Sequence, residues 1–420
     1  EVAAGQLGMK ARNNLLSSMT DDVSEIVLED NRLQTLTLSI AQRDGAENLP
    51  AHIRLIESFE AAGQLNRAVE GIASNDELSR RATERQGLTR PELAVVMATA
   101  KLALQDAIEK TDLGSDAATL PDLLAAFPPG MRKRHIKAIE SHRLRGEIIA
   151  TKLANRIVNR LGLIHPFELA EEESATLGDV AEAFVIAEQV YGIASVWQAI
   201  DNGEMPEATR LMLFEQIAVE MRAHMADILR NSVAGRSNDK AIIAYRPMVE
   251  RISAELGNLL TEEARKQTLA YADRLNKGGT PRKLVEQLVR LAELDGAIGL
   301  GALAARAKTD VIALTHGFTA LGAALGIDWA QGTAMQLDPR DPWERLLAAG
   351  LARDFQAMRL EFLGRKGGKT PLAVVEQWLA EHAMRVATFR TMVDRARTGA
   401  APTPAMLAQI AGQARQLLSS

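Results

Sequence analysis

The chain has 420 residues, of which 47% are hydrophobic and 25% are charged, and its formal net charge is −5 at pH 7. This balance is that of an ordinary globular protein, and it lacks the basic footprint that nucleic-acid binding needs. The absence of cysteine excludes disulfides, thiolate metal ligands and a cysteine nucleophile.

No run of apolar residues reaches the roughly 18–20 that a membrane-spanning helix needs. The chain also opens on Glu1 rather than methionine, and no secretion signal follows. We therefore expect a segment of a longer cytoplasmic protein, without nucleic-acid or membrane partners.

The first part of the chain carries three signals for the start of a helix. Thr20-Asp21-Asp22 would place two carboxylates in a first turn, where they favour the positive end of the helix dipole. Ser74-Asn75-Asp76-Glu77 and Thr89-Arg90-Pro91-Glu92 both have the spacing of a capping box. The stretch from Asn31 to Ala41 is ambiguous, because its leucines and threonines would also suit a strand, and we predict a helix there.

The later part of the chain repeats these signals. A threonine whose hydroxyl can cap a helix precedes a proline at three places: Thr280-Pro281, Thr370-Pro371 and Thr403-Pro404. Thr261-Glu262-Glu263 would place two carboxylates in a first turn. Proline is tolerated at the first helical position because the N–H group there has no intrahelical partner. Helix-forming residues dominate throughout and only 4% of residues are aromatic, so strands are not favoured.

Clusters of Gly, Pro and Asn separate the predicted helices, and none is long enough for a disordered linker. The strongest breaks lie at 112–121 and near 235–240, which divides the chain into residues 1–115, a central bundle at 116–240 and a C-terminal bundle at 241–420. The predicted fold class is all-α: a multi-helix bundle of antiparallel helices joined by short loops, with little or no sheet.

Two glycine-rich motifs imitate nucleotide-binding loops. The stretch Gly364–Thr370 resembles a P-loop, but Leu363 stands where the first glycine should be and the preceding residues predict a helix. We interpret it as a basic loop between helices. Gly296, Gly299 and Gly301 have the reverse order of the dinucleotide fingerprint, and they predict a helix break or a close approach of helices.

Seven histidines are scattered along the chain, and His135 and His142 lie seven residues apart. A metal pair on a helix normally has a spacing of three or four residues, so we predict that the histidines lie at the surface or in packing positions.

A basic helix face includes Arg132, Lys133 and Arg134. Such a face is usually solvated, and the alternative is electrostatic docking on another domain or subunit. We name these three residues, together with Trp343 after a proline-rich loop, as candidate interface residues.

Several ordered strings are more specific than composition. They include Arg12-Asn13-Asn14-Leu15-Leu16, Met19-Thr20-Asp21-Asp22-Val23, Gly63-Gln64-Leu65-Asn66-Arg67, Gly87-Leu88-Thr89-Arg90-Pro91-Glu92-Leu93 and Glu147-Ile148-Ile149-Ala150-Thr151. In this order they resemble the region after the catalytic domain of the large bacterial NAD-specific glutamate dehydrogenases. The resemblance is dense over residues 1–235, and after that it rests on position and helical character. The chain departs from the family at Arg32, where an aromatic residue is usual.

The resemblance implies a parent oxidoreductase that converts L-glutamate and water to 2-oxoglutarate and ammonium while a hydride passes to NAD. It places residues 1–115 directly after the catalytic domain, and the active site and the NAD site before Glu1. We therefore expect no catalytic, cofactor-binding or metal-binding residue in this segment. The expected partners are the upstream catalytic domain of the same chain and further copies in a homo-oligomer.

Two other hypotheses stay open. The chain could be an independent helical scaffold for protein interactions, with no link to an enzyme. It could also hold a ligand pocket between its helices, such as a site for an amino-acid effector, in which an arginine and a carboxylate would bind the two charged groups of the ligand.

Overall fold

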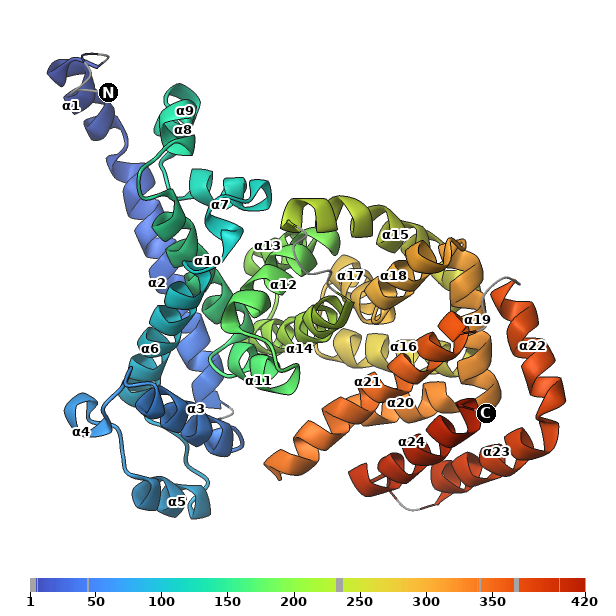
Figure 1. Ribbon diagram of the computed structural model, residues 1–420. Helices are drawn as coiled ribbons and strands as arrows, with labels where there is room; N and C mark the ends of the chain where they lie inside the picture. The colour runs from blue at the N-terminus through green and yellow to red at the C-terminus, as the bar shows by residue number, and fades with distance from the viewer. Residues whose placement is uncertain are drawn as a thin grey trace. The chain divides into compact units, whose positions relative to one another are not determined.

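The computed structural model describes residues 5, 7–43, 45–231, 237–337, 339, 341–365, 370–399 and 401–419. Helices are the only regular elements among these residues, with 24 α-helices and two short 3₁₀-helices, η1 and η2 (Figure 1). The predicted all-α fold class is confirmed.

The chain forms two compact units. Unit 1 comprises residues 1–186 with 235–240, and unit 2 comprises residues 187–234 and 241–420. The three-part division predicted from the loops differs from these units and stays a prediction. All four tryptophans and all three tyrosines of the chain belong to unit 2, a distribution that gives unit 2 its own spectroscopic signal.

Unit 1 is built around three helices that lie along one another, α2, α6 and α10 (Figure 1). Its elements are α1 (Met9–Ser18), α2 (Thr20–Arg43), α3 (Leu49–Ala61), α4 (Arg67–Glu70), α5 (Asn75–Thr83), α6 (Arg90–Ile108), η1 (Asp112–Gly114), η2 (Ala117–Thr119), α7 (Leu120–Ala125), α8 (Pro129–Arg134), α9 (Ile136–Glu140), α10 (Arg145–Leu161), α11 (His165–Glu172) and α12 (Leu177–Val190). Leu93 and Leu104 of α6 and Leu153 and Ile157 of α10 are fully buried in this core. Each such side chain contributes about 1.5–3 kcal/mol on burial.

Unit 2 consists mainly of paired helices, in which α14 packs on α18, α19 on α22, and α21 on both α20 and α24. Its helices are α13 (Ile193–Asn202), α14 (Glu207–Asn231), α15 (Asn238–Leu259), α16 (Glu262–Lys277), α17 (Arg282–Glu293), α18 (Ala297–Ala307), α19 (Val311–Leu325), α20 (Ile327–Gln336), α21 (Pro342–Arg365), α22 (Pro371–Glu381), α23 (Ala383–Thr398) and α24 (Pro404–Leu418). Phe362 and Trp378 meet edge to face in its core, with ring centroids 5.0 Å apart.

Most predicted helix starts are confirmed. The ambiguous stretch from Asn31 to Ala41 lies wholly within α2, and the hydroxyls of Thr261 and Thr403 accept from the third amides of α16 and α24, at 3.1 and 3.2 Å. Thr280 was predicted as a cap, but Pro281 is the capping residue of α17. The reason is that the N–H group of Thr280 closes the end of α16 by donating to the Leu275 carbonyl.

The start of α2 has no separate capping residue. Thr20 is the first residue of α2, and its hydroxyl donates to the Ser17 carbonyl of α1 rather than accepting from α2. The short turn between the two helices leaves no separate capping position. The carboxylates of Asp21 and Asp22 do lie in the first turn, as predicted.

The loop that imitates a P-loop follows a helix and not a strand. α21 continues to Arg365, and α22 starts at Pro371 after Thr370 as predicted, although the Thr370 hydroxyl makes no capping hydrogen bond. Residues 366–369 lie outside the described part of the chain. A P-loop needs a buried strand before its glycines, so the helical context contradicts that motif.

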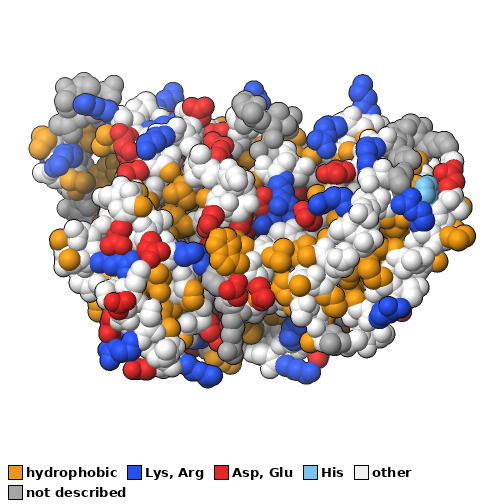
Figure 2. All heavy atoms as spheres, turned by 60° about the horizontal axis from the view of Figure 1, so that its bottom comes forward, with side chains coloured by type: hydrophobic (Ala, Val, Ile, Leu, Met, Phe, Trp, Pro, Cys, Tyr) orange, Lys and Arg blue, Asp and Glu red, His pale blue; other side chains and the backbone are white. Residues whose placement is uncertain are grey.

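The surface mixes charges of both signs. On the face drawn in Figure 2, basic and acidic side chains alternate with hydrophobic ones, and neither sign forms a continuous area. Within the described ranges no single helix is long and apolar enough to cross a membrane. Two bent pairs, α12 with α13 and α19 with α20, reach that length and composition only when taken together.

Candidate functional site

The string Gly87–Leu93 fastens the end of α2 to the start of α6. Arg90, the first residue of α6, reaches across to α2, where its guanidinium donates to the Thr35 carbonyl at 3.2 Å. It also donates to the Ser39 hydroxyl and the Gln42 side-chain oxygen, both at 3.3 Å. We call the contact made by Gly45, Gly87 and Arg90 the α2–α6 joint.

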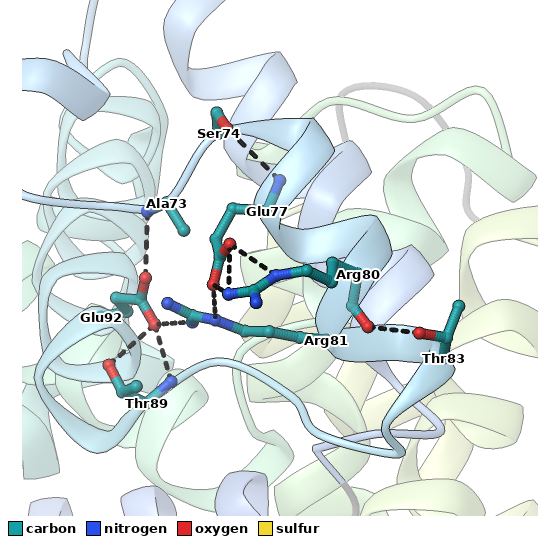
Figure 3. A network of polar contacts seen from close by, with 8 residues as sticks. All are labelled: Ala73, Ser74, Glu77, Arg80, Arg81, Thr83, Thr89 and Glu92. Atoms are coloured by element: carbon teal, nitrogen blue, oxygen red, sulfur yellow. Dashed lines mark hydrogen bonds and ion pairs between the residues drawn. The ribbon is translucent and has the colours of Figure 1, made fainter.

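Glu92, two residues after Arg90 in the first turn of α6, is buried and ties α6 to α5 (Figure 3). Its side chain collects four hydrogen bonds although the residue is only 5% exposed. One carboxylate oxygen accepts from the backbone N–H of Ala73 at 3.0 Å, and the other accepts from the N–H and the hydroxyl of Thr89, both at 2.7 Å. The predicted reach of Glu92 back to Thr89 is thereby confirmed.

Arg81 of α5 supplies the fourth bond and links Glu92 to Glu77 (Figure 3). Its guanidinium lies 2.8 Å from Glu92 Oε2 and 3.2 Å from Glu77 Oε1. Ser74 caps α5 as predicted, since its hydroxyl accepts from the N–H of Glu77. The carboxylate of Glu77 does not complete that box, because it pairs with Arg80 and Arg81 instead.

The electrostatics of Glu92 favour its charged form. Burial alone would raise the pKa of this carboxyl, but the hydrogen bonds from Thr89, Ala73 and Arg81 outweigh burial and lower it. A carboxylate that is ionised and fully bonded in this way holds three chain segments together. Glu92 therefore positions α5 and the segment at Ala73 against the start of α6, and its two carboxylate oxygens are occupied by these contacts.

Two glycines allow the backbones to meet at the joint. A Cβ on Gly87 would lie 2.7 Å from the Cα of Gly45, with other backbone atoms of Gly45 closer still. Real Cβ atoms essentially never come so near to another backbone. Gly45 stands just after α2 and Gly87 just before α6, so only glycine at position 87 lets the two helix ends converge.

We expect Gly87→Ala to loosen the joint, because the new methyl group forces the loop at Gly45 away. Overpacking of this kind typically costs about 1–3 kcal/mol. Hydrogen exchange of the amides around Ser39 and Gln42 should become faster in the variant. Gly146→Ala is the matched control, since Gly146 lies within α10 and no atom lies within 4 Å of its Cβ, and exchange near Gln42 should then be unchanged. Equal exchange in both variants would contradict the assignment of the joint.

The predicted interface residues fall into different units. Lys133 and Arg134 of α8 are exposed in unit 1, whereas the guanidinium of Arg132 donates to the carbonyls of Phe127 and Ala125 and so closes the end of α7. Trp343 is 77% exposed at the start of α21 in unit 2. The interface role of these four residues stays a prediction.

The glycine cluster of unit 2 acts as predicted, and a carboxylate fills the place that a phosphate would need. Gly296 breaks the chain at a positive φ of 80°, and Gly299 lets Asp227 approach the start of α18. One oxygen of Asp227 accepts from the N–H groups of Ile298 and Gly299, at 3.0 and 3.1 Å. The N-terminus of a helix binds anions, and here the anion is the protein's own, so these residues do not fit a dinucleotide.

Sequence reasoning missed a line of ionisable side chains that α14 buries in unit 2. Glu220, His224 and Asp227 share one helix face through the spacing i, i+4, i+7, and all three are buried. Burial raises the pKa of Glu220 to about 7 and lowers that of His224 to about 3. The ring of His224 stacks on Tyr191, with centroids 3.8 Å apart. The sequence does contain a signal for this line, because ionisable residues stand here at the i, i+4, i+7 spacing that apolar residues normally have on the buried face of a helix.

A buried arginine also lies in unit 2. Arg359 is 3% exposed; its guanidinium lies 3.9 Å over the ring of Phe318 and donates to the Phe355 carbonyl and the Gln331 side-chain oxygen. Burial lowers its pKa to about 10, and the charges of Asp328 and Asp295 oppose that shift. An amino-acid effector would need such an arginine beside carboxylates, but this guanidinium is engaged by its neighbours, and the effector site stays a prediction.

The histidines lie as the sequence suggested. His142 accepts from the N–H of Leu144 and faces the ring of Phe127, while His52 and His224 are buried in packing positions. Among the residues that the structure describes, no group of three or more His, Asp or Glu side chains is arranged to hold a metal ion.

Buried carboxylates and arginines thus hold the helices of an all-α domain to one another. Residues 85–416 match the family model described as "Glutamate dehydrogenase, C-terminal", and residues 1–41 match the one described as "Bacterial NAD-glutamate dehydrogenase, catalytic domain". The chain therefore belongs to the glutamate dehydrogenase C-terminal family. The two matches end and begin on either side of the α2–α6 joint.

Three curated relatives carry the name "NAD-specific glutamate dehydrogenase". The protein of Halomonas elongata is 28% identical over 405 residues, which cover 95% of this chain and 25% of that protein. The protein of Pseudomonas aeruginosa is 28% identical over 97% of this chain and 26% of its own length. The Mycobacterium tuberculosis protein is 27% identical over 99% of this chain and 26% of its own length. The chain spans about a quarter of the length of these relatives, and the resemblance continues beyond residue 235.

Proposed function

We propose that this chain is the C-terminal helical domain of an NAD-specific glutamate dehydrogenase. The whole enzyme would oxidise L-glutamate to 2-oxoglutarate and ammonium with NAD. The segment itself supplies no catalytic group and binds no NAD. Its role is to hold the end of the catalytic domain in place, and to support its stability and assembly.

The observation that carries this proposal is the position of the α2–α6 joint. The segment that resembles the catalytic domain ends within α2, and the segment that resembles the C-terminal domain begins just before Gly87. Arg90 and the paired glycines bind the two together with side-chain and backbone contacts. A helix that is fixed in this way transmits the position of one domain to the other, and domain closure gates many dehydrogenases.

Two further parts of the proposal concern the setting. The enzyme would act in the cytoplasm, and it would be a homo-oligomer whose subunits meet through surfaces such as Lys133 and Arg134 of α8 or Trp343 of α21. Exposure of these side chains supports an interface role. Light scattering of the full-length enzyme measures the subunit number, and a monomer would contradict this part.

The deciding experiment measures glutamate-dependent reduction of NAD by three preparations: this segment, the upstream part, and the two mixed. We expect no turnover from the segment alone, and a gain in activity or thermal stability of the upstream part on mixing. Arg90→Ala should reduce the gain. Arg80→Ala is the matched control, because Arg80 is exposed and pairs with Glu77 on its own helix.

Each outcome has a clear reading. Turnover by the segment alone would refute the non-catalytic role. A silent segment that changes nothing in the mixture would favour the independent helical scaffold instead.

A further inference from the structure

The first two helices of unit 1 present apolar side chains that the unit does not cover. α1 has no buried residue, and α2 buries only Leu36 and Thr37 among its 24 residues. Their large exposed hydrophobic residues are Met9, Leu16, Val23, Val27 and Leu28, which are between 46% and 66% exposed. Five such residues within twenty positions are more than the single scattered ones that surfaces normally carry.

Helical spacing gathers these residues into stripes. Met9 and Leu16 are seven residues apart and therefore share one face of α1, and Val23 and Val27 share one face of α2 at a spacing of four. Further along, α2 is buried against the unit, and the hydroxyl of Thr37 donates to the Asn159 carbonyl of α10. The helix is thus packed on the unit at its C-terminal half and exposed at its N-terminal half.

Charged side chains border the apolar stripes. Glu25 and Glu29 are exposed on α2. The start of α8 lies against the turn between α1 and α2, since a Cβ on Gly130 would be 3.5 Å from the Cγ of Met19. α8 then carries exposed Lys133 and Arg134. An apolar centre with a polar rim of both signs is the usual composition of a protein interface.

We infer that the exposed face of α1 and α2, defined by Met9, Leu16, Val23, Val27 and Leu28, docks on the preceding part of the catalytic domain. This inference rests on the proposed function and names the surface through which the segment would hold the catalytic domain. The occupant follows from the comparison with known families, because residues 1–41 match the catalytic domain and not the C-terminal one. The relatives are about four times as long as this chain, and α1 and most of α2 lie in the segment that matches the catalytic-domain model.

The test uses the full-length enzyme and compares the double variant Val23→Glu, Val27→Glu with the wild type by hydrogen exchange. Both side chains are about half exposed in unit 1, so the unit should fold with glutamates there. We expect exchange of the amides of residues 9–28 to accelerate by about tenfold, and one stretch of the upstream catalytic domain to accelerate with them. Val69→Glu is the matched control, since Val69 of α4 is 77% exposed and lies outside the face. It should change neither region.

Several results would overturn the inference. The double variant could behave like Val69→Glu, with no change in any upstream peptide. Protection of residues 9–28 that rises with protein concentration would instead assign the face to a second copy of the chain. Turnover of the full-length wild type separates this inference from the proposed function. If the wild type reduces NAD with glutamate but the double variant shows no upstream change, only the docking inference is overturned. If the wild type shows no glutamate-dependent turnover, the proposed function is refuted.

Discussion

Replacing Asp227 with alanine should lower the free energy of unfolding of unit 2 at pH 5 by about 1–3 kcal/mol, the range seen when buried hydrogen-bond donors lose their acceptor. The carboxylate accepts from the N–H groups of Ile298 and Gly299, and its other oxygen accepts from the amides of Asn231 and Gln356, at 3.0 and 3.4 Å. Alanine leaves the buried N–H groups of Ile298 and Gly299 and the amide of Gln356 without this acceptor, whereas the amide of Asn231 keeps its bond to the backbone carbonyl of residue 227. Because burial raises the pKa of Asp227 to about 7, the stability that this carboxyl contributes falls as the pH rises, so the loss should be larger at pH 5 than at pH 8.

Tryptophan fluorescence during urea unfolding measures this effect in unit 2 alone, because unit 1 contains no tryptophan. Asp273→Ala is the matched control, since that carboxylate pairs with Lys277 at the surface of α16. Exposed pairs contribute about 0–1 kcal/mol. A loss at Asp227 no larger than that at Asp273 would show that the capping contacts do not form.

Glu220→Gln should raise the free energy of unfolding of unit 2, and the size of this gain should depend strongly on pH. Burial raises the pKa of Glu220 from 4.5 to about 7, so the folded protein keeps this proton over a range in which the unfolded chain has lost it. The stability of the wild type therefore falls as the pH rises from about 4.5 to about 7, and it stays low above that. Glutamine cannot ionise, and its oxygen can still accept the bond from Gln216.

We expect the Glu220→Gln variant to match the wild type at pH 5 and to be more stable by about 2–3 kcal/mol at pH 8, given about 1.4 kcal/mol for each unit of pKa. The same fluorescence measurement at both pH values gives the answer. Glu286→Gln on α17 controls for the loss of a negative charge, because Glu286 is exposed and pairs with Arg282. An equal gain at both pH values would indicate improved packing rather than a buried titrating group.

Local chemistry predicted the fold well where a signal and its partner lie within one turn. Thr261 and Thr403 cap their helices because the hydroxyl needs only the amide three residues ahead. Thr280 shows the limit of that reasoning, since its backbone serves the preceding helix and shifts the next start by one residue. Glu77 shows it as well, because two neighbouring arginines compete for the carboxylate that the capping box would use.

The site could be predicted only in part, because its contacts are distant in sequence. The string around Glu92 was recognised, but nothing local shows that Arg90 reaches residues about fifty positions earlier. Asp227 was missed for the same reason, since its partners are some seventy residues away. The glycines near it were read correctly, because a helix break and a close approach leave a mark in the sequence itself.

α2 is held near both of its ends within unit 1. Arg90, Thr37 and the pairing of Lys152 with Asp30 contact it from residue 30 onward, and Met19, directly before its first residue, is buried near Gly130 of α8. The 24 residues of α2 are about 36 Å long. Because a helix fixed near both ends moves as one rigid body with the elements that hold it, any displacement of α6 and α10 carries the whole length of α2 with it.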